Sequence, residues 1–337
     1  TGDVAPNVAT ATGVAGALFT AGADGVKSVA ISGPVFDVIY KDANGFAQTE
    51  TVAWGAGVVG ADGATTFTAT SANYPAGTPA AVLVIKADGS YSLTLGAPVA
   101  HDTVGTSEDN KSLSFDFTVT DGDGDKATGT LKVEVDDDTP VSKGTVTASR
   151  ELDDEAQSEF TPANNGGGFD ANPNYNTVSG AAGALFTAGA DGVKSVALSG
   201  PAFDVIYKDA QGFAQTEAVS WGAGVVGSDG ATTFTATSLN YPAGTPAAVL
   251  VIKADGSYTF TLGAPIAQGF TFPGIEESKT LSFGVTVTDG DGDKANATLK
   301  VDVNDDTPAP VASIVFGSAT LDDEAQSEFT PVNLGGT

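Results

Sequence analysis

Two long stretches of this sequence occur twice. GALFTAGADGVKSVA, residues 16–30, recurs at 183–197, and YPAGTPAAVLVIKADGSY, residues 74–91, recurs at 241–258. The offset is 167 residues between Lys27 and Lys194 and 168 between Asp121 and Asp289, so one long unit is repeated with almost constant length. A unit of this length can bury a core of its own. The chain is therefore predicted to be part of a tandem array, with two large domains or two pairs of smaller ones.

Acidic residues outnumber basic ones, with 42 Asp and Glu against 14 Lys and Arg and a formal net charge of −28. This charge excludes nucleic acid as the natural partner and disfavours anionic membrane surfaces, whereas it attracts cations. Cysteine is absent, so disulfides and thiolate metal sites are excluded, and oxygen-liganded Ca²⁺ suits the composition. No apolar run approaches the roughly 20 residues of a membrane span, so we expect no direct membrane insertion. Thr1 opens no export signal, and we expect an interior segment of a longer protein.

Short apolar or alternating runs, rich in β-branched and aromatic residues and bounded by turn residues, predict strands. No stretch shows sustained helical periodicity. The clearest alternation is in SLSFDFTV, from Ser112, and TLKVEV, from Thr130, which predict a hairpin turned at DGDGD. We therefore expect an all-β fold of tandem antiparallel β-sandwich domains. In the first copy the expected strands cover residues 28–32, 35–41, 49–54, 65–70, 80–86, 91–95, 111–120 and 126–135.

The sequence allows two positions for the unit boundary. A strand that runs into DDDTP, residues 136–140, or NDDTP, residues 304–308, looks like a domain exit. This boundary gives a first unit over 1–140 that lacks its opening segment and a complete second unit over 141–308. Residues 309–337 then begin a third unit or close the second. The alternative phase divides the chain into 1–168 and 169–337.

An acidic turn, DGDGD, recurs once per unit. Glycine permits positive φ, and carboxylates at alternate positions can converge on one centre, as in half of a calcium loop. Asp-Gly pairs also form plain hairpin turns, but three carboxylates within five residues repel one another and exceed what a turn needs. We predict calcium ligands at Asp121, Asp123 and Asp125, and at Asp289, Asp291 and Asp293.

A second acidic cluster follows the last strand of each unit. The strand over 126–135 spans on the order of 33 Å, so the DGDGD turn and the acidic exit lie at opposite poles of a unit. In a head-to-tail array the exit of one unit therefore faces the turn of the next, and carboxylates meeting there need cations between them. A solvated acidic linker is the alternative. The candidate ligands are Asp136, Asp137 and Asp138 in the first unit and Asp305 and Asp306, after Asn304, in the second.

A third acidic motif, LDDEAQSEFTP, occupies residues 152–162 and 321–331. A glutamate can close a calcium shell with both of its oxygens, but a solvated strand end or loop needs no ion. The ADG turns at Asp24, Asp62 and Asp88 are expected to be ordinary turns. The candidate ligands of the third motif are Asp153, Asp154 and Glu155, with Asp322, Asp323 and Glu324 in the second copy.

Aromatic residues and the single histidine give weaker signals. Aromatics inside alternating runs, such as Trp54 and Tyr74, usually belong to a core. An exposed Trp could stack on a sugar, which makes a calcium-dependent glycan-binding module the second hypothesis, with avidity from repeated weak sites. His101 lies where the two copies differ, so we expect no role repeated in each unit. A carboxylate-pair glycosidase is disfavoured because the acids lie on turns and poles and no nucleophile motif is present, so we expect no enzyme.

Within the long repeat, several segments follow one another in a fixed order: a strand, the turn VTDGDGDKA, a second strand, VDDDTP and a downstream LDDE. This order resembles the tandem extender repeats of giant bacterial repeats-in-toxin (RTX) adhesins, exported by type I secretion, and GALFTAGADG is similar to a repeat type in those proteins. The resemblance covers essentially the whole chain. It implies extracellular, calcium-loaded, immunoglobulin-like β-sandwich modules that extend an adhesin from a Gram-negative cell surface for cell adhesion and biofilm formation. It also implies calcium ligation by the DGDGD turns and the exit acids.

The unit is longer than a simple immunoglobulin-like extender, which leaves room for an inserted β subdomain over residues 36–95. The glycine-rich nonapeptide array of the class is absent from this sequence. The implied partners are neighbouring repeats of the same chain in a monomeric rod, with surface glycans or biofilm matrix bound through other domains. Weak sites, with dissociation constants of ~10⁻⁴ to 10⁻³ M, would fill outside the cell and stay empty in cytosol.

Overall fold

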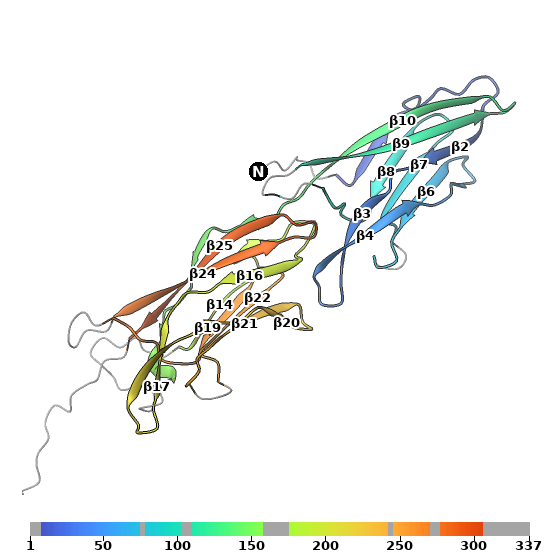
Figure 1. Cartoon of the computed structure of the whole chain (residues 1–337). Helices are drawn as coiled ribbons and strands as arrows, with labels where there is room; N and C mark the ends of the chain where they lie inside the picture. Colours follow the sequence, from blue (N-terminus) through green and yellow to red (C-terminus); the bar gives the residue numbers. More distant parts are fainter. Residues whose placement is uncertain are drawn as a thin grey trace, which may run out of the picture.

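The computed structural model describes residues 8–74, 78–102, 105, 109–157, 175–241, 245–269 and 277–305. Within these ranges every regular element is a strand except one short 3₁₀ helix, η1 (Asp154–Gln157). None of the described residues forms a helix long and apolar enough to cross a membrane. The all-β prediction is therefore confirmed for the described part of the chain. Two β bodies follow each other along the long axis of the molecule, and we term them the first and second units (Figure 1).

The first unit is built from two sheets. One sheet has the strand order β1-β8-β7-β6-β4-β3 with β5 beside β6, and the other has the order β10-β9-β2. The eight strands predicted in this copy correspond to β2 to β4 and β6 to β10, with ends within two residues. The strands are β1 (Thr10–Gly13), β2 (Val26–Ser32), β3 (Phe36–Lys41), β4 (Ala47–Trp54), β5 (Val58–Val59), β6 (Thr65–Thr70), β7 (Ala81–Ile85), β8 (Tyr91–Leu95), β9 (Asn110–Asp121) and β10 (Lys126–Asp136).

The core of the first unit lies between its two sheets. Leu83 and Leu93 from one sheet cluster with Leu113 and Phe115 from the other. Alternate residues of β9 are buried, because successive side chains of a strand point to opposite faces. The expected inserted subdomain over 36–95 is wrong. Its strands, β3 to β8, form one of the two sheets and share this core with β9 and β10, so they have no separate core that a subdomain would need.

The second unit repeats this plan and adds strands. Its sheets have the orders β14-β23-β22-β21-β19, with β20 beside β21, and β12-β25-β24-β16, with β13 beside β25; β17 pairs with β18, and β11 with β15. The strands are β11 (Val141–Ser142), β12 (Thr145–Thr147), β13 (Leu152–Asp153), β14 (Thr177–Gly180), β15 (Phe186–Thr187), β16 (Ser195–Ser199), β17 (Asp204–Lys208), β18 (Ala214–Ala218), β19 (Ser220–Trp221), β20 (Val225–Val226), β21 (Ala231–Thr237), β22 (Ala248–Lys253), β23 (Tyr258–Leu262), β24 (Ser278–Thr288) and β25 (Lys294–Asn304).

The segment from β11 to β13 distinguishes the two units. β12 and β13 run parallel to β25 along its outer edge, with Val146 opposite Leu299 and Leu152 opposite Val303. Leu152 is fully buried in the core of the second unit. In the first unit β10, the equivalent of β25, is the outermost strand of its sheet among the described residues.

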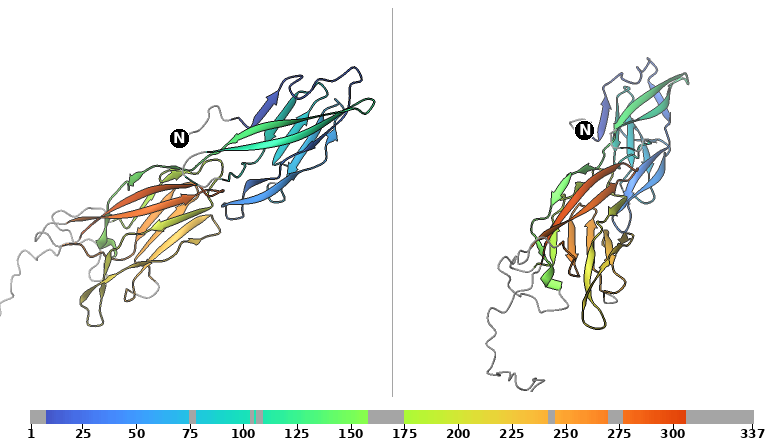
Figure 2. Two further views of the ribbon diagram at one scale, coloured as in Figure 1. Left: turned by 45° about the horizontal axis from the view of Figure 1, so that its top comes forward. Right: turned by 60° about the vertical axis from the view of Figure 1, so that its left-hand side comes forward.

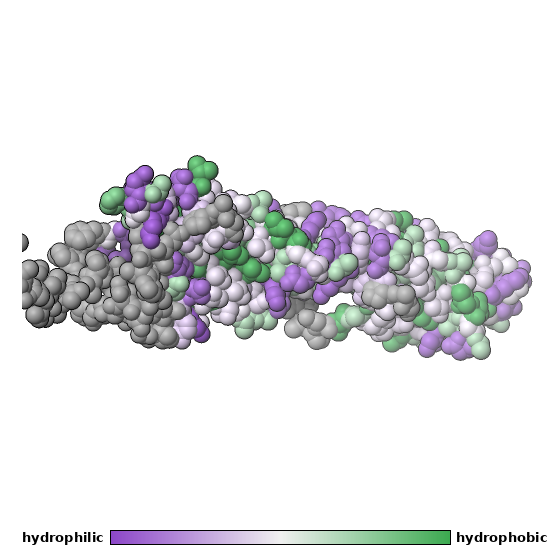
Figure 3. Space-filling view, turned by 90° about the horizontal axis from the view of Figure 1, so that it is seen from below, coloured by the Kyte–Doolittle hydropathy of each residue, from purple (hydrophilic) through white to green (hydrophobic). Residues whose placement is uncertain are grey.

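The predicted hairpin at DGDGD is confirmed. β9 and β10 pair in register from Thr120 and Lys126 beside the turn to Asn110 and Asp136 at the other end, and β24 and β25 form the same hairpin in the second unit. Both hairpins run along the long axis of the molecule in two independent views (Figure 2). The space-filling view shows an elongated particle with hydrophilic and hydrophobic residues intermixed along the visible face (Figure 3).

Candidate metal centre at the junction of the two units

The two units meet through backbone hydrogen bonds and a small apolar contact. Ala47 N donates to Val193 O at 2.7 Å, and Lys294 N donates to Gly105 O at 3.1 Å. Phe46, in the loop between β3 and β4, joins the hydrophobic core of the second unit. The tip of the first unit's β3–β4 hairpin is thereby anchored on its neighbour.

Acidic side chains from three separate segments converge at this junction. Asp137 follows β10, Asp191 lies in the loop between β15 and β16, and Asp291 lies in the β24–β25 turn. Each offers one carboxylate oxygen, and these oxygens all lie within 4.8 Å of one another. Asp137 and Asp191 are buried, with exposed fractions of 5% and 4%. The acidic exit of the first unit, at the open end of the β9–β10 hairpin, therefore lies beside the DGDGD turn that closes the β24–β25 hairpin of the second unit.

The DGDGD turn is held by its first aspartate. One oxygen of Asp289, Oδ1, accepts hydrogen bonds from the backbone N–H groups of Gly292 at 3.0 Å and Asp293 at 2.7 Å. Gly292 has a φ of +123°, which a residue with a side chain rarely adopts. The turn thus uses one oxygen of Asp289 and leaves the other, Oδ2, for a different partner.

Backbone groups of the first unit position the remaining turn acids. His101 N donates to Asp291 Oδ2 at 3.0 Å, and Gly105 N donates to Asp293 Oδ1. The imidazole of His101 is itself fixed, because its Nδ1 lies 2.8 Å from Asp109 Oδ1. Backbone donors of the first unit therefore hold carboxylates of the second unit in place.

Five carboxylate oxygens at the junction are buried and have no hydrogen-bond partner. Buried polar atoms without partners are rare in folded proteins, so a group of five requires an explanation. Hard divalent cations prefer six to eight oxygen ligands, largely from carboxylates and backbone carbonyls. The residues present therefore suit such a cation. The atoms are Asp137 Oδ2, Asp191 Oδ2, Asp289 Oδ2, Asp291 Oδ1 and Asp293 Oδ2.

The electrostatics of the cluster point in the same direction. Burial, together with the charges of Asp291 and Asp137, raises the pKa of Asp191 to about 9. Burial likewise raises the pKa of Asp289 to about 8, and that of Asp137 to about 6 despite the opposing effect of His101. Without a cation, Asp191 and Asp289 therefore hold protons at neutral pH, whereas Asp137 is mostly ionised. A bound cation would replace those protons and favour the ionised form.

The free end of the first unit carries an equivalent acidic group. Asp24, Asp121 and Asp123, which correspond to Asp191, Asp289 and Asp291, again lie with one oxygen each within 4.8 Å of one another. Here Asp24 and Asp123 are exposed. Among the described residues, no exit segment lies against this end. It contains the same turn acids without the contribution of a second unit.

The other predicted ligands have different positions. Asp138 accepts a hydrogen bond from Ala190 N across the junction, Asp136 ends β10, and Asp125 is exposed in the first turn. At the far end of the second unit, Asp153 and Asp154 are buried and Asp305 N donates to Glu277 O. No three-residue metal group formed by the described residues includes Asp153, Asp154 or Asp305. Glu155 has its backbone in η1, and Asp306, Asp322, Asp323 and Glu324 lie outside the described residues.

Asp191 was missed by the sequence reasoning, which expected its equivalent Asp24 to lie in an ordinary turn. The other ADG turns do behave so, since Asp62 Oδ1 accepts from Ala64 N and Asp88 Oδ1 accepts from Ser90 N. In these turns the backbone N–H two residues after the aspartate donates to its carboxylate. Among the described hydrogen bonds, Val193 N makes no such bond to Asp191. The available signal was its place inside the repeated string GALFTAGADGVKSVA.

The aromatic residues considered for sugar stacking pack against other rings instead. Trp54 lies edge-on to Phe115 with ring centroids 5.1 Å apart, and Trp221 lies edge-on to Phe283 at 5.6 Å. Tyr74 uses its hydroxyl to donate to Gly96 O. Both tryptophans are partly buried and pack against the cores of their units.

Comparisons with known proteins give little further information. No family model matches the sequence, and no curated protein matches it. One solved structure, described as "Ca2+-stabilized adhesin helps an Antarctic bacterium reach out and bind ice", is 14% identical over 83% of this chain and 91% of that chain, with a TM-score of 0.13. A likeness at that TM-score carries no argument about the fold or function of this chain.

Proposed function

We propose that this chain is a calcium-stiffened spacer of a bacterial surface adhesin, built from tandem immunoglobulin-like β-sandwich domains. The observation that carries the proposal is the junction. Acidic side chains of both units meet there, and five of their buried oxygens have no hydrogen-bond donor. Such a cluster repels itself unless a cation lies between its members. The two units would then be held in one relative orientation only when the cation is present.

The residues of the junction have distinct tasks in this proposal. Asp137 supplies a carboxylate from the first unit, whereas Asp191 and Asp291 supply theirs from the second. The backbone of His101 orients Asp291, and the turn bonds of Asp289 hold the DGDGD loop in shape. A bound Ca²⁺ supplies positive charge and accepts the free oxygens as ligands. Because the complete ligand set exists only in the ordered junction, binding stabilises that junction by mass action, by about 2.7 kcal/mol at a hundredfold excess over the dissociation constant.

The composition of the sequence and its resemblance to adhesin repeats support the proposed location and biological role. Millimolar calcium outside cells would fill weak sites of ~10⁻⁴ to 10⁻³ M that stay empty in cytosol. A cysteine-free chain needs no oxidation step after export. Together with the resemblance to RTX adhesin repeats, this supports a cell-surface rod, exported by type I secretion, that serves adhesion and biofilm formation. The proposal assigns no reaction to the chain.

Calcium titration of matched variants tests the proposal. Asp291→Asn changes the turn at the junction, and Asp123→Asn makes the same change in the exposed turn of the first unit. We expect isothermal titration calorimetry to show that Asp291→Asn weakens the tightest calcium site at least about tenfold, equivalent to ~1.4 kcal/mol. Asp123→Asn should leave that site unchanged. Equal loss in both variants, or no calcium binding by the unmodified chain, would contradict a junction site.

A further inference from the structure

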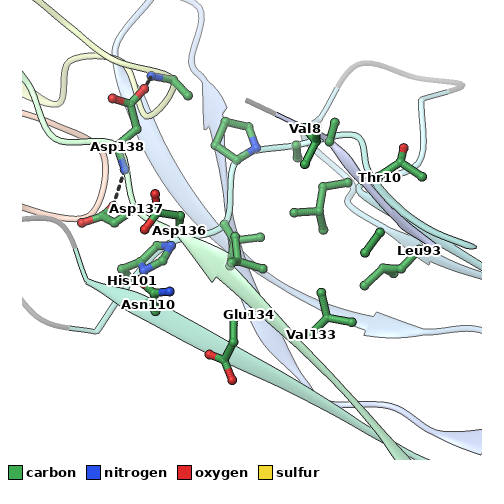
Figure 4. A pocket seen from close by; sticks show the side chains of 18 of the residues that line it. Val8, Thr10, Leu93, His101, Asn110, Val133, Glu134, Asp136, Asp137 and Asp138 are labelled. Carbon is green, nitrogen blue, oxygen red and sulfur yellow. Dashed lines mark hydrogen bonds between the residues drawn. The ribbon is translucent and has the colours of Figure 1, made fainter. Parts of the chain in front are cut away.

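The single histidine of the chain lies among carboxylates at the exit of the first unit. His101 is 7% exposed, and its Nδ1 lies 2.8 Å from Asp109 Oδ1. His101 and Asp137 both line a cavity of about 650 Å³ (Figure 4). One ligand atom each of His101, Asp109 and Asp137 lies within 4.8 Å of the other two, and we term these three residues the histidine cluster.

The fold of the first unit brings these three side chains together. β9 begins one residue after Asp109 and β10 ends one residue before Asp137, and Asp137 N donates to Asp109 O at 3.0 Å. His101 reaches the two aspartates from the segment that follows β8. The backbone of that segment is held in place because Lys111 Nζ donates to Ala100 O at 2.8 Å. All three residues of the histidine cluster therefore belong to the first unit.

The buried carboxylate of Asp137 has an oxygen available for a cation in this cluster. Its Oδ1 accepts a hydrogen bond from Asp138 N at 2.9 Å, whereas its Oδ2 is buried and has no hydrogen-bond partner among the described residues. Asp137 also belongs to the acidic group with Asp191 and Asp291, so the two groups share this carboxylate. A carboxylate offers two oxygens with about four lone-pair sites and can serve two cations. The histidine cluster can therefore hold an ion of its own beside an occupied calcium site.

The imidazole changes which cation such a cluster prefers. Ca²⁺ takes oxygen ligands, whereas imidazole nitrogen suits Zn²⁺ and other divalent transition metals. Zinc sites with three protein ligands keep a further position for water. Ligand atoms at about 2.0 Å from a tetrahedral ion lie roughly 3.3 Å apart. The 2.8 Å between His101 Nδ1 and Asp109 Oδ1 is close to that separation, so an ion can replace the proton that they share.

The second unit lacks this cluster although its fold is the same. Gln268 in APIAQ occupies the place of His101 in APVAH, and its Nε2 donates to Val303 O at 3.1 Å. A glutamine therefore fits this place in the fold. The equivalents of the two carboxylates are Glu277 and Asp305, and no three-residue metal group of the described residues includes either. The histidine thus distinguishes the exit of the first unit chemically.

We propose that His101, Asp109 and Asp137 bind a divalent transition-metal ion, with Zn²⁺ as the probe, at a site distinct from the calcium cluster of the junction. His101 supplies an imidazole nitrogen, and the two aspartates supply carboxylate oxygens. The ion joins the segment after β8 to the start of β9 and the end of β10, so it stabilises the exit of the first unit. The site does not depend on calcium, because all of its ligands belong to one unit.

Zinc titration of untagged protein in millimolar calcium tests the proposal. We expect isothermal titration calorimetry to show a zinc site that His101→Gln weakens at least about tenfold, since loss of a group behind a metal ligand alone costs that much. Asp109→Asn should weaken the same site. The control is Asp102→Asn, which changes a neighbouring exposed carboxylate and should leave zinc affinity unchanged. Equal zinc affinity of the unmodified chain and His101→Gln would overturn the proposal.

Nuclear magnetic resonance gives an independent readout on the unmodified chain, because His101 is its only histidine. The imidazole resonances should shift as Zn²⁺ is added and stop shifting when one equivalent is bound. Zinc binding that leaves these resonances in place would mean that the ion lies on carboxylates alone, against the proposal. If circular dichroism shows that His101→Gln does not fold, this measurement decides alone.

Asp291→Asn separates the zinc site from the proposed calcium site. It should weaken calcium binding and leave the zinc-induced shift of the His101 resonances intact. His101→Gln should retain calcium binding, because the backbone N–H of residue 101 that donates to Asp291 is unchanged. A chain that binds no calcium but shows the zinc-induced shift would contradict the proposed function only. Loss of the zinc-induced shift in Asp291→Asn would show one common site and overturn the inference.

Discussion

Asp191 shows how one residue acquires a different character from its surroundings. It is 4% exposed and surrounded by other acids, whereas its equivalent Asp24, in an identical stretch of sequence, is exposed. Burial and neighbouring charges raise the pKa of Asp191 to about 9. The difference arises from the adjacent unit, which covers Asp191 and leaves Asp24 in contact with solvent.

Replacing Asp191 should therefore have opposite effects with and without calcium. Without calcium, burial of Asp191 requires its carboxyl group to take up a proton, a cost that Asp191→Asn removes, so the melting temperature of the junction should rise. With calcium, the variant lacks a ligand, and the increase in melting temperature that calcium produces should shrink. Differential scanning calorimetry in chelator and in millimolar calcium measures both effects.

The control for this variant is Asp24→Asn, which makes the same change at the exposed site. It should alter neither melting temperature by more than a degree or so, since surface substitutions usually change stability by less than about 0.5 kcal/mol. An Asp191→Asn variant that lowers the melting temperature in chelator would show that the carboxylate is stabilising without a cation, against our account.

The raised pKa values also predict how stability depends on pH. Asp191, Asp289 and Asp137 have pKa values of about 9, 8 and 6 in the folded chain, against ordinary values near 4 when unfolded. Between those limits the folded chain binds more protons than the unfolded chain, so stability falls as pH rises. In chelator, we expect the melting temperature to increase as pH is lowered from about 9 to about 6.

In millimolar calcium the same pH series should be nearly flat above neutral pH, because the cation keeps the carboxylates ionised. The comparison of the two series is the informative measurement. A melting temperature that rises with pH in chelator would mean that these carboxylates are stabilised as anions by groups other than a cation.

Strands could be predicted from the sequence where apolar and polar residues alternate over many positions. β9 and β10, with 12 and 11 residues, alternate clearly and were placed within one residue at each end. β5, β11 and β13 have two residues each, too few for any periodicity. The parallel pairing of β12 and β13 with β25 joins residues about 150 positions apart, which no local pattern encodes. The inserted subdomain was inferred from unit length alone, and its strands instead complete the main sheet.

The candidate site was partly predictable for a similar reason. The meeting of Asp137 with Asp291 follows from the length of one strand, because a hairpin separates its turn from its ends. Asp191 could not be placed, since the path of the loop between β15 and β16 depends on how both sheets pack. His101 could not be predicted to hold Asp291, because it does so through its backbone N–H, which is independent of residue type.

The β3–β4 hairpin also contributes to the orientation of the two units, because its tip contacts the second unit, and one glycine tests this contribution. Gly230 has a φ of +74°, and a Cβ there would lie 2.2 Å from Asn44 O at the tip of that hairpin. Gly63, its equivalent, has a φ of +78° with no atom within 4 Å of such a Cβ. Gly230→Ala and Gly63→Ala should therefore cost a similar ~1 kcal/mol in backbone strain.

Only Gly230→Ala should disturb the junction. Distance distributions between one spin label on each unit, measured by pulsed electron paramagnetic resonance in calcium, should broaden in Gly230→Ala and stay narrow in Gly63→Ala. Equal distributions in the two variants would show that the hairpin tip does not constrain the orientation of the units.

At the scale of the whole molecule, acidity and shape are connected. A chain with a net charge of −28 resists bringing its acidic poles together, yet the two units meet through an acidic surface. Under the proposed function, the elongated arrangement in Figures 1 and 2 depends on a cation that neutralises that surface. An array of such units would be stiff where cations are available and would bend at every junction where they are removed.

Small-angle X-ray scattering in millimolar calcium and after chelation tests this most directly, with Asp137→Asn as the comparison. We expect the unmodified chain to scatter as a narrow rod in calcium and as a broader range of bent shapes in chelator. Asp137→Asn should resemble the chelated chain even in calcium, while circular dichroism shows both units still folded. Identical scattering of the unmodified chain in both conditions would contradict the claim that cations at this junction set the shape of the molecule.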